Sequence, residues 1–121
     1  MAMTASLEDY LKIAGLVADR GELRLTDIAA RLGVSKPSAL AALKKLEELG
    51  LVEHKRYRRF KLTKEGIRRS AEIGERYSTL TAFLLNIVGV TATTAEKDAC
   101  KMEHIFSSET YKKIKAMVPS R

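Results

Sequence analysis

The segment Asp98–Ser107, DACKMEHIFS, holds three side chains that could bind a metal or take part in chemistry. It contains Cys100, the only cysteine of the chain, followed three and four residues later by Glu103 and His104. Positions three and four apart on an α-helix lie on the same face. The spacing therefore predicts a thiol, a carboxylate and an imidazole gathered on one side of a helix.

Three interpretations of this group are open. A thiol activated by an imidazole could act as a nucleophile, but the sequence has no recognisable oxyanion-hole motif or substrate pocket, so we do not expect an enzyme. A metal site would need a further ligand from elsewhere, because one helix rarely encloses a cation alone. The third interpretation is a polar stripe on an amphipathic helix. These residues alone do not decide between the last two.

Composition narrows the class of protein. A chain of 121 residues forms one domain, or a small domain with an accessory helical unit, and its hydrophobic fraction of 45% is sufficient for a packed core. The net charge of +7 favours an anionic partner, nucleic acid before membrane. A single cysteine cannot form an internal disulfide. With no signal-peptide core and no apolar stretch long enough to span a bilayer, we expect a cytoplasmic protein without a membrane partner.

The first half of the chain is expected to hold three helices and a hairpin. Apolar residues at helical spacing predict helices over about residues 7–20, 26–32 and 36–49, ended by Gly21, Gly33 and Gly50. Thr26 is the expected cap of the second helix, and Ser35 or Lys36 that of the third. Residues 51–55 and 59–63 then predict a two-stranded hairpin. This order is typical of a winged helix-turn-helix, a DNA-binding fold.

The second half is expected to be entirely helical. Thr63 opens a long helix that we expect to reach Val88, and the capping-box spacing from Thr93 to Glu96 precedes the helix that carries Cys100. A last short helix starts at Ser107 or Ser108. The predicted fold is mainly α, with an N-terminal winged helix-turn-helix (two-stranded wing) over residues 1–63 and an α-helical domain over residues 64–121.

The third helix and the hairpin carry the expected DNA contacts. Leu40, Leu43 and Leu46 share the face that should pack inward. On the other face, Ser38 could bond a base edge, and small alanines could meet thymine methyl groups. Basic residues would contact phosphates, which position the protein without specifying a sequence. The predicted contact residues are Lys36, Pro37, Ser38, Ala41, Ala42 and Lys45 on the helix and Lys55, Arg56, Arg58 and Arg59 on the hairpin.

Several segments together resemble the diphtheria-toxin-repressor and manganese-transport-regulator family of metal-dependent repressors. They are SLEDYLKIAGLV, LTDIAARLGVSKPSALAALKKLEELGLV, LTKEGIRRS, LLNIVGV and DACKMEHIFSSE. The resemblance covers the chain from about Ser6 to Met117. It implies a homodimer in which a winged-helix part binds DNA and a helical part, the dimerisation domain, carries the subunit interface and metal ligands.

The resemblance also implies a ligand set. By position, Cys100, Glu103 and His104 match the family's ligands on the dimerisation helix, and Asp9 matches the ligand of the first helix. The chain departs from the family at other ligand positions, which hold Tyr77 (or Ser78, if the register shifts by one), Lys12, Thr81 and Glu96. One metal per subunit is therefore expected, bound by Asp9, Cys100, Glu103 and His104.

The expected function is a repressor of metal-homeostasis genes that binds a near-palindromic double-stranded DNA site as a homodimer, with a divalent metal as corepressor. Because a thiolate suits softer ions than manganese, Cys100 favours Fe2+ as the bound ion, with Mn2+, Co2+, Ni2+ or Zn2+ also possible. The alternative is a metal-independent winged-helix regulator or adaptor in which the metal site is vestigial.

Overall fold

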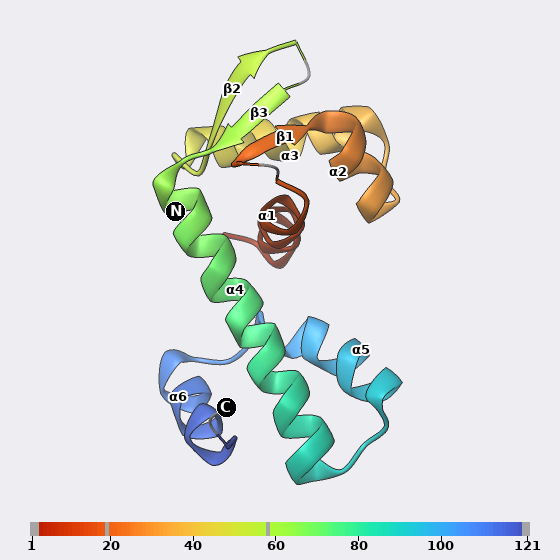
Figure 1. Cartoon of the computed structure of the whole chain (residues 1–121), viewed down its shortest axis with the longest axis vertical. Helices are drawn as coiled ribbons and strands as arrows, with labels where there is room; N and C mark the ends of the chain where they lie inside the picture. The colour runs from red at the N-terminus through yellow and green to blue at the C-terminus, as the bar shows by residue number, and fades with distance from the viewer. Residues whose placement is uncertain (1–2, 19, 58, 120–121) are drawn as a thin grey trace. The chain divides into compact units, whose positions relative to one another are not determined.

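The computed structural model describes residues 3–18, 20–57 and 59–119. These residues form six α-helices, one π-helical turn and three short strands, so the mainly helical fold expected from the sequence is confirmed. The chain divides into two compact units, residues 1–72 and 73–121. The first part of α4 (Lys64–Phe83) therefore lies in the first unit and its remainder in the second (Figure 1).

The first unit holds α1 (Ala5–Val17), α2 (Leu25–Leu32) and α3 (Lys36–Glu48). The Ser35 side chain caps α3 by accepting a hydrogen bond from the Ser38 amide, as predicted, and Pro37 lies in the first turn, where no amide is needed. Two boundaries were predicted wrongly. Helix α1 ends at Val17, before Gly21, and α2 begins at Leu25, so Thr26 lies inside it. The residues directly before α2 form a strand instead.

The sheet of the first unit has three antiparallel strands in the order β1-β3-β2. The wing is formed by β2 (Val52–Arg56) and β3 (Arg59–Leu62), and β1 (Glu22–Arg24) pairs with the other edge of β3. The wing expected to be two-stranded is thus extended by a third strand. In β1 only Leu23 is buried, opposite Phe60, and three residues are too few for an alternating pattern to be recognised.

One apolar core joins the helices and the sheet of this unit. Its fully buried side chains include Leu11, Ile28, Leu43, Leu46 and Phe60. Leu43 and Leu46 come from the face of α3 that was expected to pack inward, and Leu40 beside them is half-buried. The opposite face of α3 is consequently left at the surface.

Helix α4 begins in close contact with the sheet. The Thr63 hydroxyl donates to the Gly50 carbonyl (2.7 Å) and accepts a hydrogen bond from the Gly66 amide (3.0 Å). A Cβ atom added at Gly66 would lie 2.0 Å from the Leu51 carbonyl oxygen. Only glycine permits so close an approach, so the start of α4 is tied firmly to the base of the wing.

The second unit contains the rest of α4, a π-helical turn η1 (Leu84–Val88), α5 (Ala92–Met102) and α6 (Ser108–Met117). Leu80, Leu84, Ala95, Ala99 and Ile114 form its core. Ser107 caps α6, as predicted, whereas α5 is capped by Thr91 and not by Thr93.

The end of the long helix is wider than an α-helix. In η1 the Gly89 amide donates to the carbonyl of Leu84, five residues earlier, at 2.9 Å. The helix was expected to reach Val88, and it does so only through this turn. Leu85, Ile87 and Val88 are exposed there. No helix among the described residues combines the length and apolar character needed to cross a membrane.

Candidate metal centre and DNA-binding surface

Cys100 lies in the last full turn of α5, and Glu103 and His104 follow the end of the helix. Ala95 and Ala99 are buried on one side of α5, which places Cys100 beside this packed face. The helix ends at Met102, with Glu103 as its C-cap. The expectation that all three side chains share one helix is therefore wrong. Glu103 and His104 belong to the turn of residues 103–105, here called the ligand turn.

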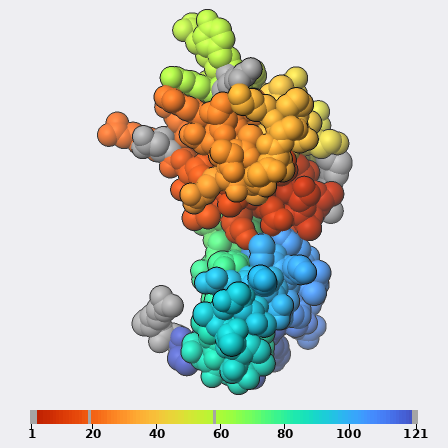
Figure 2. Space-filling view, turned by 90° about the vertical axis from the view of Figure 1, so that its right-hand side faces the viewer, coloured from red at the N-terminus to blue at the C-terminus, as the bar shows by residue number. Residues whose placement is uncertain are grey.

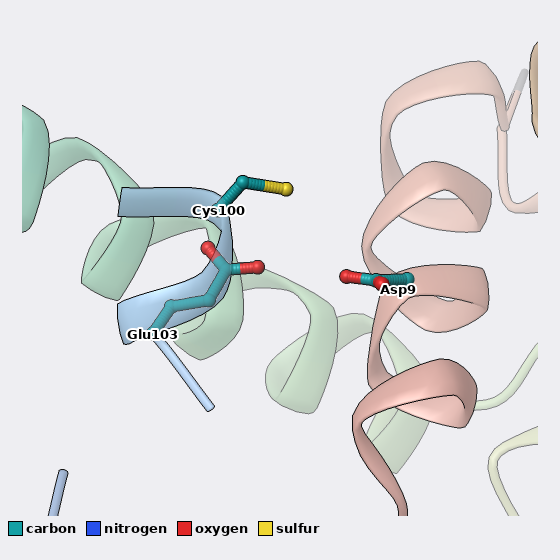
Figure 3. Close-up of side chains that lie close together, drawn as sticks. All are labelled: Asp9, Cys100 and Glu103. Carbon is teal, nitrogen blue, oxygen red and sulfur yellow. The ribbon is translucent and has the colours of Figure 1, made fainter. Parts of the chain in front are cut away.

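These side chains nevertheless lie close together. A carboxylate oxygen of Glu103 lies within 4.8 Å of the Cys100 sulfur, and the side chains of both residues project to the same side (Figure 3). The Nε2 atom of His104 is 3.3 Å from Oε1 of Glu103. Glu103 is only 2% exposed, whereas Cys100 is at the surface. The second unit thus places the Glu103 carboxylate close to Cys100 and also close to His104, through a turn where a helix was expected.

The chemistry of this donor set fits a divalent transition metal. A thiolate is a soft ligand, a carboxylate a hard one and an imidazole lies between them, a mixture that first-row divalent ions accept. A carboxylate as buried as that of Glu103 is costly unless a positive charge is close. A cation bound beside the imidazole of His104 would supply that charge.

The fourth proposed ligand, Asp9, belongs to the first unit. It lies on α1 (Figure 3). It directly precedes the buried Tyr10, and its own side chain is half-buried. Lys12, at a position where the resemblance implies a ligand in the family, is half-buried on the same helix.

Tyr77 replaces a family ligand with a packing residue. Its half-buried side chain packs against the core of the second unit, and its carbonyl accepts a hydrogen bond from the Thr81 hydroxyl at 2.8 Å. Ser78, the alternative at this position, is exposed, as is Glu96 on α5.

The outer face of α3 presents most of the residues expected to meet DNA. Lys36, Pro37, Ser38, Ala41 and Lys45 are all exposed. Ala42 is 9% exposed and belongs to the core, so its expected place on the outer face is wrong. An alanine fits either face, and the leucine pattern alone did not show that the buried stripe is wide enough to include it.

The wing carries exposed cations and an aromatic residue. Lys55, Arg56 and Arg59 are exposed, with Lys55 3.1 Å from Glu53, and Arg58 lies outside the described residues. Tyr57, at the tip, is 86% exposed, and it adopts a left-handed backbone with φ of 55°. Figure 2 shows the tip of the wing, in yellow-green, standing out from the body of the first unit. Tyr57 was not among the residues predicted to contact DNA. The signal that could have drawn attention to it is its position between two arginines in the sequence RYR.

A winged-helix unit followed by a helical unit with clustered metal-type donors defines a class of metal-responsive DNA-binding regulators. Residues 2–60 match the family described as iron dependent repressor, N-terminal DNA binding domain. Residues 63–120 match the family described as iron dependent repressor, metal binding and dimerisation domain. The chain belongs to this iron-dependent repressor family, and the resemblance to the diphtheria-toxin-repressor and manganese-transport-regulator proteins is confirmed.

Individual relatives agree with this assignment. The chain is 42% identical over 105 residues to the transcriptional regulator MntR of Escherichia coli O157:H7, covering 86% of this chain and 67% of the relative. It is 34% identical over 116 residues to an HTH-type transcriptional regulator of Methanocaldococcus jannaschii, covering 93% and 92%. Both comparisons extend through the two units.

Solved structures show the same fold. A manganese-dependent transcriptional repressor in complex with manganese superposes with a TM-score of 0.78 at 29% identity, over 92% of this chain and 51% of that one. The manganese regulator SloR gives a TM-score of 0.80 at 28% identity, over 95% and 54%. The chain thus spans about half the length of these structures.

Proposed function

We propose that the protein is a transcriptional repressor that binds DNA as a homodimer with a divalent metal as corepressor. The observation that carries the proposal is the buried carboxylate of Glu103, which lies close to Cys100 on one hand and to His104 on the other, in the unit that matches a metal-binding and dimerisation domain. The adjoining unit matches a DNA-binding domain and exposes basic residues on α3 and the wing. The proposed action is regulatory and not enzymatic.

Asp9, Cys100, Glu103 and His104 would hold the metal, one ion per subunit. A bound ion would supply a positive charge shared by Asp9 of α1 and by the donors of the second unit. Glu103 offers a buried carboxylate beside His104, so little side-chain freedom is lost on binding. Cys100 is exposed, so an incoming ion can reach its side chain.

The regulatory step then concerns the DNA-binding units. Two recognition helices of a dimer read half-sites about one helical turn apart only when their spacing is right. Restricting the first unit relative to the second would raise the fraction of binding-competent dimers, and the apparent affinity rises with that fraction. The exposed Leu85, Ile87 and Val88 are candidates for a share of the subunit interface.

For DNA recognition we propose that Ser38 and Ala41 face base edges while Lys36, Lys45, Lys55, Arg56 and Arg59 contact phosphates. Pro37 lies in the first turn of α3, where its missing amide costs no hydrogen bond and its fixed φ suits the helix. The hydroxyl of Ser35 donates to that of Ser38 at 2.9 Å, which orients the Ser38 side chain at the start of α3. A near-palindromic site follows from two such surfaces in a symmetric dimer.

The identity of the ion is where sequence and relatives differ. Cys100 by itself favours Fe2+. The relatives instead favour manganese, because they include proteins named MntR and a solved repressor complex with manganese. We therefore propose Mn2+ as the first candidate for the physiological ion, with Fe2+ as its competitor in the same experiment.

A second candidate function is metal-independent regulation. Tyr77 packs against the core at a position where the family has a metal-binding histidine, which favours loss of part of the site. The DNA-binding surface would then work without an ion.

DNA binding measured with and without metal separates the two functions. The metal-stripped protein is titrated with Mn2+, and anaerobically with Fe2+, while its affinity for operator-type DNA is followed by fluorescence anisotropy. We expect metal to tighten binding, and His104→Ala to abolish this response while keeping helical content and dimerisation. Lys97→Ala, a change of an exposed residue on α5 that belongs to none of the family's ligand positions, serves as the control. Equal affinity with and without either ion would favour the metal-independent function.

A further inference from the structure

The ligand turn is not held by helical hydrogen bonds alone. The amides of Glu103, His104 and Ile105 donate to carbonyls of the last turn of α5. The carbonyls at a helix end have no intrahelical partner. The backbone that carries two of the proposed ligands therefore depends on donors from another element.

Arg76 of α4 supplies these donors. Its Nη1 atom donates to the Glu103 carbonyl at 3.3 Å, and its Nη2 atom donates to the Phe106 carbonyl at 3.0 Å. One guanidinium thus bridges the first residue of the turn and the residue directly after it. A positive charge at the C-terminus of α5 is also favoured by the helix dipole.

Tyr111 of α6 holds Arg76 from another side. The guanidinium carbon lies 4.8 Å from the centre of the Tyr111 ring, within cation–π range. The Tyr111 hydroxyl donates to the Thr79 hydroxyl of α4 at 3.2 Å, which fixes the ring. The guanidinium is therefore held in place by contacts with residues outside the ligand set. A lysine has a single ammonium in place of the fork of donors that reaches both carbonyls.

We propose that Arg76 is a positioning residue for the metal site, acting on Glu103 and His104 through the backbone of the ligand turn. The inference rests on the proposed function of these residues as metal ligands. Partners outside the ligand set that orient ligands typically contribute roughly 10- to 100-fold in metal affinity, and an effect of this size is expected here. Cys100 precedes the turn and lies within α5, so its orientation should depend less on Arg76.

Cobalt(II) binding to the full chain tests this inference. The thiolate-to-cobalt charge-transfer band reports Cys100, and the d–d bands report the geometry of the whole ligand set. We expect Arg76→Gln to weaken Co2+ binding by about 10- to 100-fold and to change the d–d bands, with the thiolate band retained. In the metal-free protein, amide hydrogen exchange of residues 103–106 should become faster.

Arg68→Gln is the matched control, because Arg68 lies on the same helix but in the first unit, where it pairs with Glu65 and Glu72. This control should leave the cobalt spectrum unchanged. Arg76→Lys keeps the positive charge but loses the forked pair of N–H donors, so its Co2+ affinity should lie between those of wild type and Arg76→Gln. If Arg76→Gln does not fold, Arg76→Lys is used for the test in its place.

The outcomes are distinct. If wild type binds cobalt and a folded Arg76 variant shows the same affinity and d–d bands, the inference is overturned and the proposed metal site stands. If wild type itself binds no cobalt, the proposed site fails and the inference with it. A variant that exchanges faster in the turn and binds cobalt weakly with altered d–d bands supports positioning over a merely structural role.

Discussion

The residues of α3 and the wing proposed to bind DNA are of two chemical kinds, polar side chains suited to base edges and cations suited to phosphates. Ser38 is exposed near the start of α3, with its hydroxyl oriented by Ser35. A hydroxyl of this kind can take part in base-edge hydrogen bonds, whereas a charged side chain such as Arg59 on the wing attracts any phosphate. The two kinds of residue should therefore respond differently to substitution.

Ser38→Ala is expected to reduce discrimination between operator and altered DNA sequences, with little change in binding to random DNA. Arg59→Ala should weaken binding to all sequences to a similar extent, because phosphate contacts carry no sequence information. Competition binding with a set of single-base operator variants measures both effects. If Ser38→Ala leaves the ranking of the variants intact, Ser38 does not read bases.

At the scale of elements, the boundary between β3 and α4 depends on a glycine. The Gly66 backbone approaches the Leu51 carbonyl so closely that an added Cβ would lie 2.0 Å from the oxygen. Gly74, further along the same helix, has nothing within 4 Å of an added Cβ. A side chain is thus excluded by a neighbouring carbonyl at Gly66, whereas there is space for one at Gly74.

Gly66→Ala is expected to lower the free energy of unfolding by about 1–3 kcal/mol, the usual cost of forcing a methyl group into a packed site. Gly74→Ala should raise it by about 0.5–1 kcal/mol, because alanine loses less conformational freedom than glycine in a helix. Urea unfolding followed by circular dichroism measures both. Equal effects of the two substitutions would contradict the close approach at Gly66.

Local chemistry predicted many of these elements from the sequence. Ser35 and Ser107 are caps whose side chains precede amphipathic helices, so local chemistry limited each cap to two neighbouring residues, and the structure selects the first of each pair. Strand β1 was not predicted, because three residues with one buried leucine become a strand only by pairing with β3. The formation of β1 therefore depends on a tertiary contact and not on its local sequence.

Local spacing predicted one part of the candidate site and could not predict another. Residues three apart lie close in a helix and also in the turn at its end, so the grouping of Cys100 with Glu103 survived the end of α5 at Met102. Arg76 lies 27 residues before Glu103 in the chain, and no local pattern joins them. Spacing predicted the grouping of these side chains and the resemblance implied their role as ligands, whereas only the fold revealed Arg76 beside their backbone.

At the scale of the whole molecule, the proposed symmetric dimer doubles every DNA contact. Each phosphate contact contributes about 0.9 to the slope of log affinity against log salt concentration. A single substitution in a dimer bound to two half-sites removes two such contacts. The salt dependence therefore reports the stoichiometry as well as the charge of the interface.

Lys45→Ala is expected to reduce the magnitude of this slope by about 1.8, which is two contacts of about 0.9 each. Lys112→Ala, a change of an exposed lysine on α6, should leave it unchanged. Anisotropy titrations at several salt concentrations give the slopes. A reduction near 0.9 would indicate one recognition helix per DNA site, against the dimer.

Because of the π-helical turn, the number of residues in the segment Leu84–Val88 helps to determine which side chains lie at the surface. A π-turn spans one residue more than an α-turn, as the bond from the Gly89 amide to the Leu84 carbonyl shows. Removing one residue from Leu84–Val88 would restore α-helical geometry and rotate the next residues of the chain by about 100° around the helix axis. Which apolar side chains face outward there is thus set by the count of residues as much as by their identity. An insertion or deletion, a change that leaves every side chain chemically intact, could redirect this surface toward a different partner.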